Sequence, residues 1–96
     1  MNSKHITMDK KYVRKKELLS SRMDNEIVMM HPESGKYFAL NPVASRIWDL
    51  LETPHNLNEL VEKLLKEFDV SEETCCKEVS AFLKEMSEKK LVVISE

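Results

Sequence analysis

The most reactive side chains in this 96-residue chain belong to two adjacent cysteines and three histidines. Cys75 and Cys76 could bind a metal ion or respond to oxidants, because both reactions use a thiolate and a nearby helix N-terminus favours that form. A metal site needs further ligands at regular spacing, and His5, His31 and His55 fall in three separate parts of the chain. We therefore predict no metal ion, no disulfide and no catalytic residues, and interpret both cysteines as reduced core residues. A redox or metal module is the less favoured alternative.

Composition and length disfavour other kinds of catalysis. The chain has a single glycine, Gly35, and so cannot build a glycine-rich loop around a phosphate. One domain of this size has a modest core and little depth for an enclosed active site. We expect a binding protein that is not an enzyme and carries no cofactor. No apolar run approaches the roughly 20 residues that cross a bilayer, and no signal peptide is evident, so we expect a cytoplasmic location.

The charged residues are unevenly distributed. Residues 1–22 contain seven basic and two acidic side chains, whereas the whole chain has a net charge of -2, so the remainder is acidic. A basic segment can bind nucleic acid or a membrane, but a solvated terminus is the commoner case. We predict that residues 1–10 form a flexible basic segment and that residues 11–96 form the domain.

Two β-prone runs separated by a short turn predict a hairpin. Residues 26–31 and 36–40 are rich in β-branched, aromatic and other apolar residues, and Pro32-Glu33-Ser34-Gly35 lies between them. The glycine supplies the positive φ that such a turn requires. Apolar residues occupy both alternating positions, so neither face of the hairpin is expected to contact water alone. Residues 12–14 predict a further short strand.

Three amphipathic helices are predicted after the hairpin. Asn41-Pro42 is a typical helix start, Asn56 and Glu59 have the spacing of a capping box, and Ser71 is a typical N-cap. The third helix extends to Lys90, and residues 91–94 form a short closing strand. The fold class is therefore α+β and winged helix-turn-helix-like, with an N-terminal three-stranded antiparallel sheet packed on three helices and a short C-terminal strand.

A winged-helix shape makes a DNA-binding transcriptional regulator the alternative function. A recognition helix places positive charge beside phosphates. The helix predicted over residues 71–90 contains five glutamates, four lysines and no arginine. We expect it to be repelled by a duplex, and we predict no nucleic-acid partner.

The strand 36–40 leads directly into Asn41-Pro42-Val43-Ala44 and then into the Ile47-Trp48 pair. These motifs resemble those of the PqqD-like proteins, also called RiPP precursor recognition elements. The resemblance continues, over residues 24–94, through Leu57-Asn58-Glu59-Leu60, Phe68-Asp69-Val70-Ser71, Phe82-Leu83 and Leu91-Val92. This chain departs from the family where glycines are common, after the first helix and before the last strand.

The resemblance implies a protein that binds the leader segment of a ribosomally made precursor peptide and presents it to a modifying enzyme or leader protease. In that family the leader adds as an antiparallel strand between the third strand and the third helix, which here predicts a site in residues 36–40 and 75–86. Lasso-peptide biosynthesis is the favoured pathway, followed by PQQ-type or radical SAM pathways, and a monomer or weak homodimer is expected. The predicted peptide-binding residues are Lys36, Tyr37, Phe38, Ala39, Leu40, Cys75, Lys77, Glu78, Val79, Phe82, Leu83 and Met86.

Overall fold

A computed structural model of the chain describes residues 10–15 and 20–95. Most of the predicted flexible segment 1–10 lies outside these residues. In chain order the elements are β1 (Lys11–Arg14), β2 (Ser20–Met23), β3 (Glu26–Met30), β4 (Tyr37–Leu40), α1 (Pro42–Leu50), β5 (His55–Asn56), α2 (Leu57–Glu67), α3 (Glu72–Glu88) and β6 (Val92–Ser95). The predicted α+β class, with its three helices, is confirmed.

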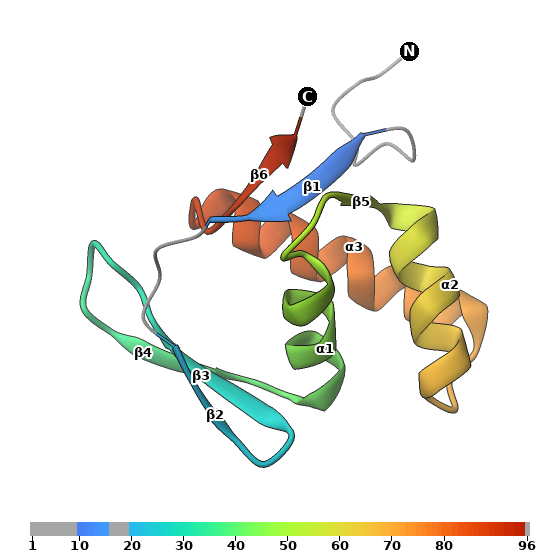
Figure 1. Cartoon of the computed structure of the whole chain (residues 1–96), viewed down its shortest axis with the longest axis horizontal. Helices are drawn as coiled ribbons and strands as arrows, with labels where there is room; N and C mark the ends of the chain where they lie inside the picture. Colours follow the sequence, from blue (N-terminus) through green and yellow to red (C-terminus); the bar gives the residue numbers. More distant parts are fainter. Residues whose placement is uncertain (1–9, 16–19, 96) are drawn as a thin grey trace.

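The described strands form two separate three-stranded antiparallel sheets (Figure 1). One has the order β2-β3-β4, and the other has the order β5-β1-β6. Figure 1 shows the β2-β3-β4 sheet on one side of α1 and the other sheet across the opposite end of the helices. The chain therefore leaves the first sheet directly through α1, enters the second sheet at β5, and returns to it at the end through β6.

The predicted three-stranded N-terminal sheet is present, but one of its expected strands is different. The strand predicted at residues 12–14 is β1, which pairs with β6 and β5 instead of with the hairpin. Its place beside β3 is taken by β2, whose exposed Ser-Ser-Arg-Met sequence lacks the apolar alternation that marks a strand. The hairpin itself was predicted correctly, with Gly35 at a φ of 72° in the turn.

The ends of the helices follow the capping signals. Asn41 caps α1 and Ser71 caps α3, in each case by accepting a backbone N–H with the side-chain oxygen. At α2 the predicted capping box is complete: Glu59 N–H donates to Asn56 Oδ1 at 2.8 Å, and Asn56 N–H donates to Glu59 Oε1 at 2.9 Å. The N–H of Asn56 thereby lowers the pKa of the Glu59 carboxyl. The last helix ends at Glu88, since Lys90 adopts a positive φ of 63°.

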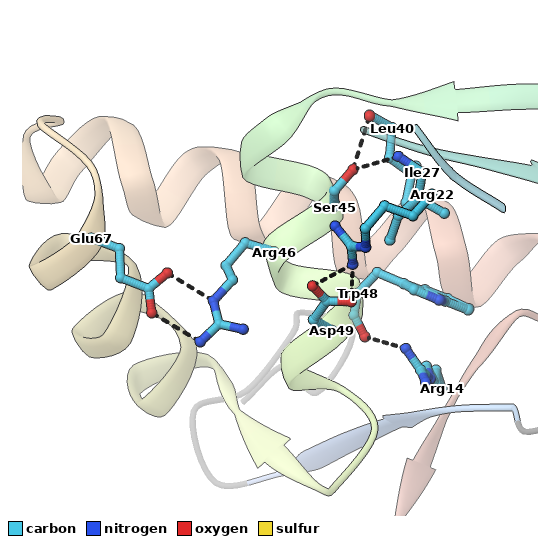
Figure 2. A network of polar contacts seen from close by, with 9 residues as sticks. All are labelled: Arg14, Arg22, Ile27, Leu40, Ser45, Arg46, Trp48, Asp49 and Glu67. Carbon is cyan, nitrogen blue, oxygen red and sulfur yellow. Dashed lines mark hydrogen bonds and ion pairs between the residues drawn. The ribbon is translucent and has the colours of Figure 1, made fainter. Parts of the chain in front are cut away.

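The core lies between the helices and both sheets. The three helices contribute the apolar positions that their periodicity predicted, and β3 and β4 add Ile27, Met29 and Leu40. Trp48 is also buried, and the Arg14 guanidinium of β1 lies over its ring at 5.4 Å from the centroid. Arg14 donates from Nη1 to the Trp48 carbonyl at 3.1 Å, so this residue joins β1 to α1 (Figure 2).

Ser45 connects α1 to the end of the hairpin. It is a buried polar residue, only 1% exposed. Its Oγ accepts from Ile27 N–H at 3.0 Å and donates to the Leu40 carbonyl at 2.9 Å, as Figure 2 shows. Ile27 and Leu40 are cross-strand partners in β3 and β4. The hydroxyl therefore bridges the two strands and fixes the first turn of α1 against them.

Replacing Ser45 with alanine is expected to destabilise the fold. The variant S45A leaves Ile27 N–H and the Leu40 carbonyl without their buried partner, which should lower the free energy of unfolding by about 1–3 kcal/mol. Urea denaturation measures this difference. The control S21A, on the exposed strand β2, should change it by less than about 0.5 kcal/mol. Equal effects in the two variants would contradict the bridging role of Ser45.

Candidate functional site

One edge of β4 is open within the described part of the chain. β4 is the last strand in the order β2-β3-β4. His31 N–H donates to the Lys36 carbonyl at 2.8 Å, which makes these two residues a hydrogen-bonded pair. Because such pairs alternate along an antiparallel ladder, Phe38 and Leu40 also point their backbone groups toward β3. The N–H and C=O groups of Tyr37 and Ala39 consequently point away from β3, toward the open edge.

A groove of about 490 Å³ runs beside this edge, between β4 and α3. Its apolar surface comes from Phe38, Leu40, Ala44, Phe82 and Met86, all of which belong to the core cluster or pack against it. We call this the β4–α3 groove. Its lining residues are His31, Ser34, Lys36, Tyr37, Phe38, Ala39, Leu40, Asn41, Ala44, Phe82, Glu85, Met86 and Lys89.

A second, smaller hollow of about 220 Å³ adjoins the first. The two share Asn41, Ala44, Phe82 and Glu85 in their linings. Glu78 lines only the smaller hollow, whereas Lys36 and Lys89 line only the larger one. The combined depression is therefore acidic where α3 passes the start of α1 and basic near the hairpin turn.

Seven of the predicted site residues line the β4–α3 groove. They are the strand residues Lys36, Tyr37, Phe38, Ala39 and Leu40 together with Phe82 and Met86 of α3. Tyr37 is 71% exposed and stands on the outer face of the sheet, while Leu40 is buried on the inner face. The sequence alone could not tell which face of β4 is buried, because both faces carry apolar residues.

Five predicted site residues do not line this groove. Cys75, Val79 and Leu83 are at most 1% exposed. The structure places these three residues in the core and not in the groove, where they were predicted. Lys77 is exposed elsewhere on α3 and pairs with Glu73 at 4.0 Å. Glu78 lies in the adjoining hollow. Apolar periodicity alone cannot separate helix residues that face the core from those that face its open margin.

Six lining residues were not predicted, and helical spacing could have indicated two of them. Glu85 and Lys89 lie three and seven positions after Phe82, on the same side of α3. They were missed because the prediction chose Lys77 and Glu78 as the charged residues of α3 at the site. The other four are His31, Ser34, Asn41 and Ala44.

The cysteine pair has the environment of core residues. Cys75 is 1% exposed, and burial raises the pKa of its thiol, which disfavours the reactive thiolate. Cys76 is half-buried and packs against the same cluster. Among residues 10–15 and 20–95 no three His, Cys, Asp or Glu side chains come together as a metal site. In the same residues no helix has the length and apolar character needed to cross a membrane.

Comparison with known proteins identifies similar sequences and structures. The family model of coenzyme PQQ synthesis protein D (PqqD) matches residues 26–92. No curated protein matches the sequence. Among solved structures, TbiB1 in complex with the TbiA(beta) leader peptide is 32% identical with a TM-score of 0.70, and the match covers 83% of this chain and 93% of that one.

A second solved structure has the same fold. Lasso peptide synthetase B1 complexed with the leader peptide is 21% identical and has a TM-score of 0.71. The match covers 85% of this chain and 96% of that chain. The arrangement of helices and sheets described above is thus shared with both proteins.

The open edge of β4 predicts a pattern of amide exchange in the free protein. Tyr37 and Ala39 N–H point toward solvent and should exchange with deuterium quickly, whereas Phe38 and Leu40 N–H bond to β3 and should be protected. Residue-resolved exchange measured by NMR tests the alternation. Uniform protection along residues 37–40 would contradict an open edge.

Proposed function

The chain belongs to the PqqD family, and on that premise we propose that it binds the leader segment of a ribosomally made precursor peptide and presents it to a separate enzyme. The observation that carries the proposal is the open edge of β4 beside an apolar groove. An extended peptide can add to such an edge as a further strand, with side chains in the adjacent pockets. Both solved structures named above hold a leader peptide.

Backbone pairing alone would not hold the leader. The N–H and C=O groups of Tyr37 and Ala39 allow four hydrogen bonds, together worth roughly 2–6 kcal/mol at the usual net value for each bond. Association and ordering of the peptide cost at least about 4 kcal/mol and often more. Each leader side chain the size of Leu, Phe or Tyr that enters the groove adds about 1.5–3 kcal/mol. We therefore infer that apolar leader residues occupy the space beside Phe38 and Phe82.

The groove is suited to binding and offers little for catalysis. Its polar lining consists of one exposed and one half-buried lysine, a glutamate, a serine, an asparagine, a tyrosine and one histidine. His31 Nδ1 accepts backbone N–H groups from Glu33 and Ser34 at 3.2 and 3.4 Å, so this ring nitrogen is engaged in the turn. We propose that the protein catalyses no reaction and raises the concentration of the leader at an enzyme that does.

The pathway we propose is lasso-peptide biosynthesis, in preference to a PQQ-type pathway, and the fold shared with lasso peptide synthetase B1 and with TbiB1, each solved with a leader peptide, supports it. The enzyme that receives the leader would then be a leader protease or another modifying enzyme acting in the cytoplasm, where precursor peptides are made. DNA binding is not favoured. Helix α3 has five glutamates against two lysines, and its apolar side is in the core.

Proline in place of Ala39 is expected to abolish leader binding while leaving the fold intact. Proline removes an N–H that points to the open edge, and its ring occupies the space where the leader backbone would lie. Titration with the leader segment of a candidate precursor peptide should shift the amides of residues 36–40 in the wild-type protein. The variant A39P should weaken binding at least about tenfold, as measured by calorimetry.

The matched control is A39V, which keeps the N–H and places a β-branched side chain on the exposed outer face. It should bind the leader like the wild-type protein. Circular dichroism and thermal unfolding establish that each variant is folded. If A39P does not fold, Y37P tests the same edge at a position whose side chain is 71% exposed. Binding that survives proline at a folded edge would refute strand addition.

A further inference from the structure

The charged residues of the β4–α3 groove are ordered along its length. Lys36 precedes β4 at the hairpin turn, and Lys89 lies at the end of α3. Glu78 lies in the adjoining hollow, about three turns of α3 before its C-cap residue Lys89. Glu85 lines both parts and lies between these ends. A segment lying in the groove therefore has basic groups near one end and acidic groups near the other.

The strands fix which end of a bound peptide meets which charge. Figure 1 shows β4 and α3 running in opposite directions. A peptide that pairs antiparallel with β4 runs from Leu40 toward Tyr37, and hence in the same direction as α3. Its N-terminal part lies near Glu78 and its C-terminal part lies near Lys36 and Lys89.

The charges at the two ends are available to a ligand. Lys36 and Glu78 are exposed and take part in no ion pair in the described part of the chain. Lys89 pairs with Glu85 at 3.5 Å, but an exposed i,i+4 pair of this kind contributes only about 0.3–0.5 kcal/mol, so a ligand carboxylate can compete for the lysine.

From this geometry we infer that the groove selects leaders by charge order: a Lys or Arg on the N-terminal side of the apolar anchors, and an Asp or Glu on the C-terminal side. The inference rests on the proposed function and specifies its substrate. Hydrogen bonds to the peptide backbone are the same for every sequence, and apolar pockets accept a reversed sequence of similar shape. The charges at the ends of the groove oppose the reversed order, because like charges then lie side by side.

Selection from a library of random peptides tests the charge order without assuming a natural ligand. The displayed peptides should have about ten residues, which at roughly 3.3 Å each extend past both ends of β4. Peptides enriched on the full chain should carry basic residues in their N-terminal third and acidic residues in their C-terminal third. Exchanging the charged ends of one selected peptide, with its apolar centre unchanged, should weaken binding roughly threefold to tenfold at low salt.

Charge reversal in the protein should reverse the preference at one end at a time. K36E should select basic residues in the C-terminal third, and E78K should select acidic residues in the N-terminal third. The matched controls K63E and E62K make the same changes in net charge on the exposed surface of α2, away from the groove. Both controls should retain the wild-type preference. If they lose it, the effect comes from net charge, and the inference fails.

The direction of the peptide is measured independently with a spin label. A nitroxide at the N-terminus of a selected peptide should broaden the amides around Glu78, and one at its C-terminus should broaden those around Lys36. Enriched peptides without charge order, or with the opposite order, would overturn the inference while leaving leader binding in place. A selection that enriches nothing, together with no binding of the natural leader, would instead refute the proposed function.

Discussion

A buried hydroxyl helps to set the position of the open strand. Ser45 Oγ stands between Ile27 N–H and the Leu40 carbonyl, where the two strands would otherwise bond to each other directly. The hairpin is thereby joined to the first turn of α1, five residues after the end of β4. Because α1 also packs against α2 and α3, the hairpin takes its orientation from the helical core. The edge of β4 consequently faces α3 across the β4–α3 groove.

An exposed strand edge is a risk for a protein, because it can pair with other chains. Here β4 is only four residues long, and Lys36 precedes it. Its outer edge faces a groove whose apolar walls, Phe82 and Met86, are continuous with the core. Short length and a nearby positive charge disfavour unspecific pairing, while the walls restrict pairing to segments whose side chains fit. The same features that limit aggregation therefore provide selectivity.

Local sequence signals predicted the helices and the hairpin, because caps and turns depend on neighbouring residues. The Asn56 capping box and Gly35 in the turn are of this kind. The pairing of β1 with β6 could not be predicted, since it joins the two ends of the described chain and leaves no local pattern. Strand β2 was missed because each of its residues is exposed, so its sequence carries no alternation.

The site could be predicted to the level of its elements but not of all its side chains. The resemblance placed it between residues 36–40 and the last helix, and a groove is found there. Val79 and Phe82 both belong to the apolar stripe of α3, yet only Phe82 reaches the groove. Which part of the stripe remains uncovered depends on how the hairpin packs on the helices, and the contact of Ser45 with the two strands contributes to that packing.

The three kinds of contact available along β4 have different selectivity. Backbone groups of Tyr37 and Ala39 bind any extended segment that contains few prolines. The apolar walls distinguish large side chains from small ones, and the charges beyond them distinguish one direction from the other. No single contact is strong, so a bound peptide can also be released. A protein that hands its ligand to another requires this combination, because selectivity accumulates from several weak contacts while the affinity stays moderate.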